Sequence, residues 1–214
     1  YHQEKLKDFI GLPFSLENFQ SQIELKQELY RNEARLTLAT VLEERYKRVK
    51  NNISALEQIK QLKDSNTYTV TTGHQLCVLG GPLYFFLKII HVIKLSERLN
   101  EHYPNQHFIP VFWMASEDHD HAEVEHLNLF NKTFQWNHEQ KGPVGRFTTK
   151  NLSSLFEEVS TLFKDDQLNE LQHVFDSFQG ETYGEAFMNW LHGLFSEKGL
   201  LIIDGDQSKL KQSF

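Results

Sequence analysis

The chain of 214 residues is poor in cysteine, proline and glycine, of which it has 1, 5 and 11. The single cysteine, Cys77, cannot form an internal disulfide, so a disulfide-stapled mini-protein is excluded and a reducing, cytoplasmic compartment is expected. Little glycine and proline, together with 39% hydrophobic residues, exclude collagen-like repeats and general disorder. The composition therefore predicts a folded globular protein, long enough to bury a core without staples.

The sequence also lacks a long hydrophobic run. Its longest apolar stretch, residues 83–95, is interrupted by Lys88, His91 and Lys94. A membrane span requires about 20 consecutive apolar residues. The residues from Tyr1 onward do not show the charged segment followed by an apolar one that marks a secretory leader. We therefore expect no membrane association.

Positive charge is scarce in the second part of the chain, whose overall net charge is −7. Residues 1–66 hold 11 Lys and Arg against 10 Asp and Glu, a balance of +1. Residues 67–214 hold 11 against 19, a balance of −8. Nucleic-acid binding draws most of its affinity from Lys and Arg that neutralise phosphates. This distribution therefore argues against a nucleic-acid partner.

Apolar residues recur every three or four positions between Ser21 and Lys63, which predicts helices. Ser21 and Glu24 fit a capping box that would open the first of them. We interpret residues 1–66 as an N-terminal helical arm whose charged residues form solvated faces. One alternative function follows from it: a non-catalytic scaffold whose arm binds a partner helix.

A β-rich run at residues 68–72 predicts the first strand of a new unit. Pro82 is suited to the first position of a helix that runs to about Asn100, and the continuous apolar run 108–115 is typical of a strand covered on both faces. Strand, helix and strand make a βαβ unit. The predicted fold class is therefore α/β, with a doubly wound and mostly parallel sheet.

The alternation resumes near the end of the chain. Thr182 and Glu185 are expected to cap a helix that ends before Gly199, and residues 200–203 to form another buried strand. The chain starts without Met and stops at Phe214, soon after this strand. We therefore interpret it as an N-terminal fragment, in which either a sheet edge is unpaired or further strands lie beside residues 200–203.

Residues 128–180 interrupt the βαβ alternation and are interpreted as an insertion. It divides the core into a first part, residues 67–127, and a truncated continuation, residues 181–214. Within the insertion we expect a small strand pair around Phe134–Trp136 and residues 145–149, and a helix opened by Ser154 and Glu157.

Ligands of open α/β sheets bind where the carboxyl ends of strands meet helix N-termini. The first such segment places Thr72, Gly73, His74 and Gln75 before a Gly80-Gly81 turn and a helix N-terminus, which favours anions. It is neither a Walker A loop nor a GxGxxG fingerprint, and the glycines could serve only a tight turn. We expect His74 and Gln75 to contact an anionic ligand group. Cys77 is most simply a small buried thiol.

The second and third segments are rich in carboxylates. Residues 116–121 are Ser116, Glu117, Asp118, His119, Asp120 and His121, and the third segment holds Asp204 and Asp206. Carboxylates held so close raise one another's pKa, which prepares groups for general acid and base catalysis. If the segment continues as a helix, His119, Glu123 and His126 lie on one face, which gives the alternative of a metal-dependent hydrolase.

Three stretches together resemble a known family, the bacillithiol biosynthesis cysteine-adding enzymes, which are cysteine ligases. They are Thr72-Gly73-His74-Gln75; Gly80-Gly81-Pro82-Leu83-Tyr84 with Lys88; and the run Pro110-Val111-Phe112-Trp113-Met114-Ala115-Ser116-Glu117-Asp118-His119-Asp120. The last run is the specific one. His74 departs from the glutamine that is commonest at its position.

The resemblance implies a Rossmann-like core of the nucleotidyltransferase and class I synthetase layout, with residues 128–180 as its first connecting peptide. It covers only the N-terminal part of the family's length, without the C-terminal helical coiled coil. The implied reaction joins the carboxyl group of cysteine to the amine of glucosaminyl malate, the last step of bacillithiol biosynthesis. The full-length protein is expected to be a homo-oligomer that binds these small molecules.

An amide does not form readily from a carboxylate and an ammonium ion, so the acid must be activated, most commonly as an adenylate. Gly73-His74-Gln75 lies where synthetases keep their HIGH motif, which makes ATP or another nucleotide a candidate without identifying the cofactor. Asp118, His119 and Asp120 are the candidate bases, with His74 as a further catalytic residue. No metal ligand is assigned. The remaining binding candidates are Thr72, Gly73, Gln75, Gly80, Gly81, Tyr84, Lys88, Trp113, Ser116, Glu117, Asp204 and Asp206.

Overall fold

The computed structural model describes residues 11–212, so the expectations about the residues from Tyr1 to 10 and about Phe214 lie outside the described residues. Strands β1 (Thr67–His74), β2 (His107–Met114) and β5 (Leu201–Asp204) form a parallel sheet in the order β1-β2-β5. The predicted α/β fold with a Rossmann-like parallel sheet is confirmed.

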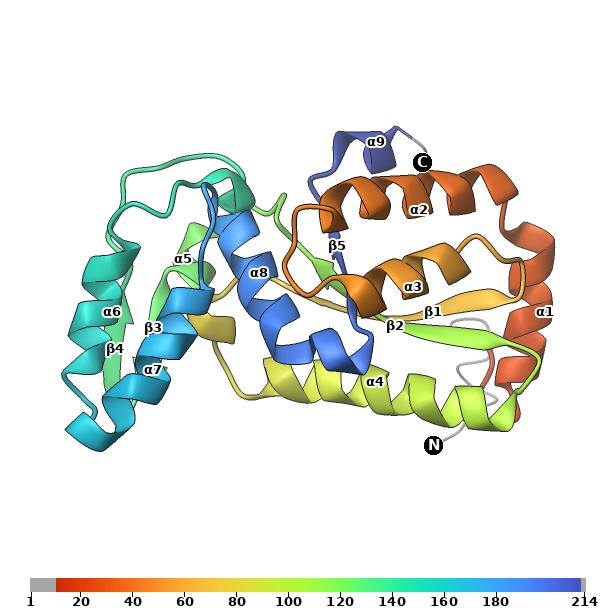
Figure 1. Cartoon of the computed structure of the whole chain (residues 1–214), viewed down its shortest axis with the longest axis horizontal. Helices are drawn as coiled ribbons and strands as arrows, with labels where there is room; N and C mark the ends of the chain where they lie inside the picture. Colours follow the sequence, from red (N-terminus) through yellow and green to blue (C-terminus); the bar gives the residue numbers. More distant parts are fainter. Residues whose placement is uncertain (1–10, 213–214) are drawn as a thin grey trace.

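Helices lie on both sides of this sheet. Helix α4 (Tyr84–His102) packs on β1 and β2, whereas α3 (Ile53–Gln61) contacts β5 and packs against α2 (Asn32–Tyr46). Figure 1 shows α4 below the sheet and both α2 and α3 above it. Strand β2 is buried at six of its eight positions because it is covered on both faces, as its continuous apolar run predicts.

Two of the N-terminal helices, α2 and α3, are part of the main core. Ala39, Tyr46 and Ile59 of α2 and α3 are buried in the same apolar cluster as Phe85 of α4 and Phe112 of β2. The inward faces of α2 and α3 are therefore occupied by the core of the domain itself.

The start of the first helix differs from the prediction. Helix α1 (Phe19–Leu29) begins after Asn18, so Ser21 lies inside it and the predicted capping box is wrong. Ile23 of α1 packs with Leu99 and Phe108 in a smaller separate cluster.

The segment between β1 and α4 contains a tight turn, and it is longer than expected because α4 begins only at Tyr84. Val78–Gly80 form a short 3₁₀ turn, and Leu79, Gly80 and Gly81 all have positive φ angles. A Cβ atom on Gly81 would lie 2.8 Å from the Cβ of Cys77, so glycine is required there. Pro82 therefore precedes α4 instead of opening it, and its carbonyl oxygen accepts the N–H of Phe85 at 2.9 Å.

The second crossover matches its prediction closely. The Thr182 hydroxyl oxygen accepts the N–H of Glu185, which caps α8 (Tyr183–Phe195). A 3₁₀ turn, Ser196–Lys198, follows, and Gly199 with φ of 67° ends it before β5. A short helix, α9 (Ser208–Lys211), comes after β5 and packs against α2.

The predicted insertion, with the two residues before it, contains an antiparallel hairpin, β3 (His126–Leu129) and β4 (Lys132–Gln135), and two helices, α6 (Leu152–Ser160) and α7 (Asp165–Ser177). Phe130 and Asn131 have φ of 48° and 63°, the geometry of a type I′ hairpin turn. The predicted pairing of Phe134–Trp136 with residues 145–149 is wrong, because the tight turn pairs β4 with β3. A 3₁₀ turn, η3 (Val144–Arg146), lies in the predicted second strand.

The predicted start of the insertion's helix is also wrong. Helix α6 begins at Leu152, after Asn151 with a left-handed φ of 64°, so Ser154 lies inside the helix. Figure 1 shows α8 between this insertion and the sheet.

The two outer strands are protected differently. The N–H of Ile202 in β5 donates to the hydroxyl of the fully buried Tyr46 at 2.8 Å. The outer edge of β5 is therefore contacted by α2 at Ile202, and the expectation of further strands beside residues 200–203 stays a prediction.

On β1, Arg35 Nη1 donates to the carbonyl oxygen of Thr67 at 2.7 Å and Lys88 Nζ to that of Gly73 at 2.5 Å. Alternate residues of a strand present their backbone groups to opposite edges. Thr69 and Thr71 therefore present theirs to the same outer edge, where no residue within 11–212 bonds to them. The uncovered sheet edge is thus the middle of β1.

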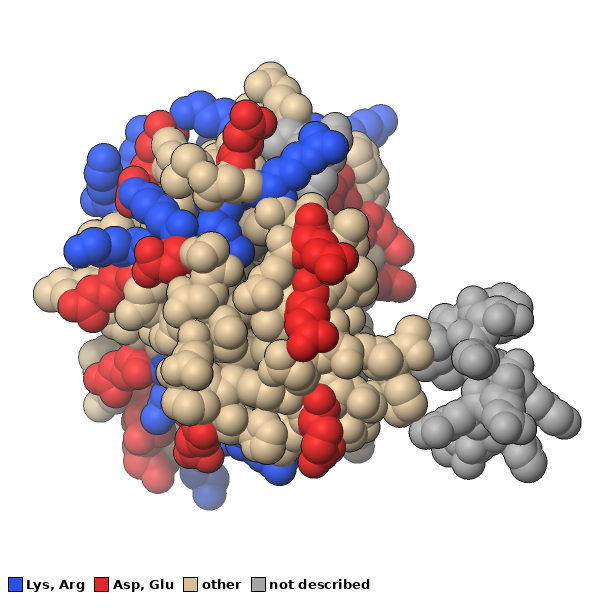
Figure 2. All heavy atoms as spheres, turned by 90° about the vertical axis from the view of Figure 1, so that its right-hand side faces the viewer, with Lys and Arg blue, Asp and Glu red and all other residues tan. Residues whose placement is uncertain are grey.

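Figure 2 shows the molecule from the side of α1, which is the right-hand side in Figure 1. Lys and Arg gather in the upper part of this face, Asp and Glu occur in separate groups, and a wide uncharged area lies between them. None of the helices within 11–212 has the length and hydrophobicity needed to cross a membrane.

Candidate functional site

The ends of the three parallel strands bring together residues from all three predicted segments. Gln75, just after β1, donates from Nε2 to Asp118 Oδ2 at 2.8 Å. Ser116, just after β2, donates from Oγ to Asp204 Oδ1 at the end of β5. We call Gln75, Ser116, Asp118, Asp204 and Asp206 the strand-end cluster.

Asp118 is a carboxylate held by three donors. Besides Gln75, the N–H groups of His119 and Asp120 donate to Oδ1 at 2.6 and 3.0 Å. These bonds, that from Gln75 first, lower the pKa of Asp118. The prediction that neighbouring carboxylates raise it is wrong for this residue, because hydrogen bonds to the charged form outweigh the opposing effect of burial.

The β2 and β5 ends are joined through one backbone group. The N–H of Asp206 lies 3.1 Å from Ser116 Oγ and 3.0 Å from Asp204 Oδ1. Next to them, Oε2 of Glu117 is buried and has no hydrogen-bond partner in the described part of the chain. A Cβ atom on Gly205 would come within 2.1 Å of that oxygen, so the glycine leaves room for the Glu117 carboxylate.

His74 lies at the edge of the cluster, beside Tyr84. Its Nε2 is 3.0 Å from the Tyr84 hydroxyl, and its Nδ1 is 3.1 Å from the carbonyl oxygen of Gln75. Burial, and to a smaller extent the charge of Lys88, lowers the pKa of His74, so the ring is neutral at pH 7. Cys77 Sγ lies 4.0 Å from Nδ1, and burial raises the pKa of this thiol.

The glycine turn uses its own amide groups. The N–H of Gly80 donates to the Cys77 carbonyl at 2.9 Å and that of Gly81 to the Val78 carbonyl at 3.1 Å. A ligand at the start of α4 would therefore have to contact other donors.

The other candidates lie around the cluster. His119 and Asp120 are exposed, and Asp120 caps the short helix α5 (His121–Val124) by accepting the N–H of Glu123 at 3.3 Å. Thr72 and Trp113 are partly buried, and Trp113 is paired with Gly73 in the β1–β2 register.

The helix required by the metal-dependent alternative is not formed. Helix α5 covers only His121–Val124, His119 precedes it and His126 lies in β3, so these side chains do not share a helical face. Among the described residues no group of three His, Cys, Asp or Glu is placed to hold a metal ion.

Sequence reasoning missed the contribution of the insertion. The N–H groups of Val144 and Gly145 donate to the carbonyl oxygens of Asp118 and Ser116 at 2.8 and 2.9 Å. Arg146, next along the chain, donates from Nε and Nη2 to the two carboxylate oxygens of Asp206 at 2.5 and 3.0 Å. The sequence gives only a weak signal for this role of Arg146, because Arg146 and Asp206 lie far apart in the chain.

Asp206 Oδ1 also accepts a hydrogen bond from Nζ of Lys211, in α9, at 2.9 Å. The hydrogen bonds from Arg146, first, and from Lys211 lower the pKa of Asp206. The insertion and α9 thus converge on one carboxylate of the strand-end cluster.

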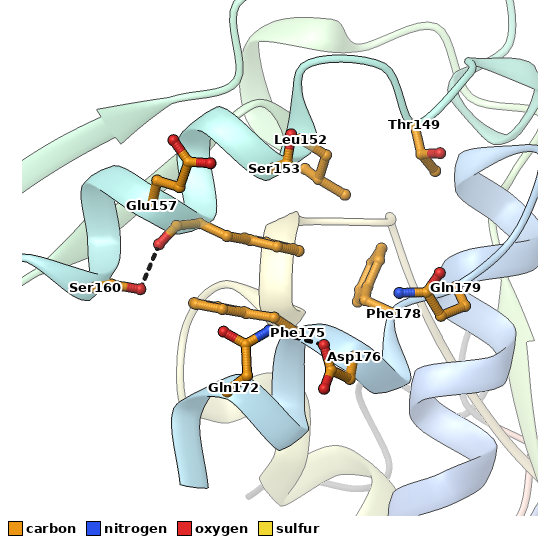
Figure 3. Close-up of a pocket in the computed structure, with 11 residues that line it drawn as sticks. Thr149, Leu152, Ser153, Glu157, Ser160, Gln172, Phe175, Asp176, Phe178 and Gln179 are labelled. Atoms are coloured by element: carbon orange, nitrogen blue, oxygen red, sulfur yellow. Dashed lines mark hydrogen bonds between the residues drawn. The ribbon is translucent and has the colours of Figure 1, made fainter. Parts of the chain in front are cut away.

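A cavity of about 350 Å³ lies elsewhere, between α6 and α7. Figure 3 shows Phe175 and Phe178 inside it, with Glu157 and Asp176 on opposite sides. The rings of Phe156 and Phe175 stack with centroids 4.1 Å apart. None of the site residues expected from the sequence lines this cavity.

A parallel sheet with polar strand ends and an inserted lobe defines the class of this protein, a Rossmann-like domain. Over residues 1–214 the chain matches the family described as "Bacillithiol biosynthesis BshC, N-terminal Rossmann-like domain". The chain belongs to this family, and the resemblance found in the sequence is confirmed.

Curated relatives named "Putative cysteine ligase BshC" agree with this assignment. The protein from Flavobacterium johnsoniae is 38% identical over 203 residues, which are 94% of this chain and 38% of the relative. That from Cytophaga hutchinsonii is 41% identical over 180 residues, 82% of this chain and 33% of the relative. The chain thus spans well under half the length of these relatives.

Proposed function

We propose that the longer protein to which this domain belongs joins the carboxyl group of cysteine to the amine of glucosaminyl malate, and that the strand-end cluster forms part of the reaction site. Membership in the bacillithiol biosynthesis family supports the choice of reaction. The observation that carries the choice of site is the convergence of Gln75–Asp118 and Ser116–Asp204 at the ends of three parallel strands.

In this proposal Asp118 holds the attacking amine. Its lowered pKa keeps it ionised, so it attracts and orients an ammonium group better than it removes a proton. His119, exposed next to it, is then the group that takes the proton before the nitrogen attacks. The C–N bond forms at the activated carboxyl carbon of cysteine, and the activating group leaves with the electron pair of the bond that breaks.

His74 and Gln75 are proposed to face the anionic end of a ligand. The one N–H of the neutral imidazole is directed at the Gln75 carbonyl oxygen, so the ligand would meet the second N–H of the Gln75 side-chain amide, whose other N–H is bonded to Asp118. A nucleotide that activates the carboxyl group would have to be bound by donors other than the Gly80 and Gly81 amides, which the turn itself uses.

The test is complementation of cells that lack the gene for the full-length protein. We expect bacillithiol to disappear in the deletion and to return with the wild type. Asp118→Asn should lower product formation by the purified full-length protein about 10²-fold or more, the usual contribution of a positioned catalytic group. Asp176→Asn, an exposed carboxylate on the α6–α7 cavity, is the matched control and should have no effect. Normal bacillithiol levels in the deletion strain would refute the proposed reaction.

A further inference from the structure

Arg146 has hydrogen-bonding capacity that its contacts with Asp206 do not use. A guanidinium group has five N–H donors in a flat fork, and here Nε and Nη2 are directed at the two oxygens of one carboxylate. Nη1 makes no hydrogen bond to any residue within 11–212, and the side chain is 67% exposed. The outer side of the fork is thus open to a second acceptor.

The position of Arg146 is fixed from both ends. Its backbone follows Val144 and Gly145, whose N–H groups bond to the loop after β2. Its side chain is anchored by Asp206, which is only 12% exposed and whose own N–H bonds to Ser116. An arginine held in this way loses little further side-chain entropy when it binds a ligand.

A second cation lies next to it. Lys211 Nζ contacts Asp206 Oδ1 at 2.9 Å and is 50% exposed. Asp204 is also close enough to act on Arg146, but its Oδ1 accepts hydrogen bonds from Ser116 and from the Asp206 N–H. The charges of the four side chains balance, and the donors left unused are those of the two cations.

We propose that Arg146 and Lys211 form an oxyanion subsite beside the strand-end cluster, and that it takes a carboxylate of the acceptor substrate. Carboxylate and phosphate oxygens are the acceptors that match an arginine fork. The assignment to the malyl carboxylates rests on the proposed function, because glucosaminyl malate carries them on the molecule whose amine must reach Asp118. The subsite itself does not depend on turnover.

The test is calorimetric titration of the full-length protein with malate, its neutral diamide and pyrophosphate. We expect malate to bind and the diamide not to bind. Arg146→Gln should weaken malate binding about 10-fold or more, as loss of a charge-assisted hydrogen bond does, and Arg146→Lys should weaken it less. Lys211→Gln should also weaken it. Lys209→Gln is the matched control, because Lys209 lies in the same short helix as Lys211 but pairs with Glu44. The affinity of this variant for malate should stay within about 2-fold of the wild type.

Malate binding that is unchanged in Arg146→Gln, or equally reduced in Lys209→Gln, overturns the subsite. Arginine-dependent binding of pyrophosphate without malate overturns its assignment to a carboxylate. A thermal melt of each variant separates loss of binding from loss of folding. If the Arg146 dependence holds while the deletion strain still makes bacillithiol, the proposed reaction fails and the subsite stands.

Discussion

Along β5, the outward N–H of Ile202 is bonded to the buried hydroxyl of Tyr46, whereas along β1 the outward backbone groups of Thr69 and Thr71 have no partner within residues 11–212. Only the two ends of β1 are closed, by Arg35 and Lys88. An unpaired edge accepts an added strand, and a covered one does not. The difference teaches that, among the described residues, α2 covers β5 at Ile202, whereas the middle of β1 has no cover.

The sharpest way to break this comparison is to remove the cover on β5. Tyr46→Ala should lower the free energy of unfolding by about 3–5 kcal/mol, because it empties a fully buried aromatic site. Tyr46→Phe keeps the ring and removes only the acceptor of the Ile202 N–H, so we expect a loss of about 1–3 kcal/mol. Urea unfolding measures both. Amide hydrogen exchange at Ile202 should quicken in Tyr46→Phe, and an unchanged rate there would contradict the proposed cover.

A smaller effect on the free energy of unfolding is expected from a change of pH, because different titratable groups lie at the two outer strands: Tyr46 beside β5 and His74 at the end of β1. Burial raises the pKa of Tyr46, so its hydroxyl stays neutral. Burial lowers the pKa of His74 at the end of β1 below the ordinary value of 6.5. The unfolded chain therefore binds more protons than the native state, and the contribution of His74 to stability, complete above pH 6.5, is lost as the pH falls toward its folded pKa.

Urea unfolding between pH 7.5 and 5 checks this sign. The wild type should lose stability as the pH falls, and His74→Gln should lose less. His107 and His138, whose pKa values burial also lowers, stay in both proteins and so serve as the internal reference. If the free energy of unfolding changed with pH equally in the two proteins, His74 would not contribute to the pH dependence.

The smallest effect is expected on the open edge itself. Thr71 is exposed, so Thr71→Lys should change the free energy of unfolding by no more than about 0.5 kcal/mol. Thr67 presents its backbone to the same edge but is 2% exposed, and Thr67→Lys should destabilise the protein severely because it buries a charge. Similar losses for the two variants would show that the middle of β1 is covered.

The parts of the fold that follow from local chemistry could be predicted from the sequence. The apolar run at residues 108–115 required a strand covered on both faces, and Thr182 with Glu185 required a helix start. The meeting of polar residues at strand ends followed from the rule for parallel sheets alone.

What could not be predicted depends on partners distant in the chain or on backbone angles. The β3–β4 hairpin turns at Phe130, and a bulky residue with positive φ has no sequence signal. The lowered pKa of Asp118 depends on Gln75, which the count of neighbouring carboxylates did not include. Arg146 was missed because its partner Asp206 is 60 residues away.

These separations also bear on how the domain folds. The hydrogen bond from Gln75 to Asp118 closes 43 residues of chain, that from Arg146 to Asp206 closes 60, and that from Ser116 to Asp204 closes 88. The entropy of loop closure must be spent before such contacts stabilise anything, so we expect the two longest, Arg146–Asp206 and Ser116–Asp204, to form after the pairing of β1 with β2. The strand-end cluster is accordingly a marker of the completed fold. In a refolding experiment its contacts should appear with the slowest phase, after the secondary structure.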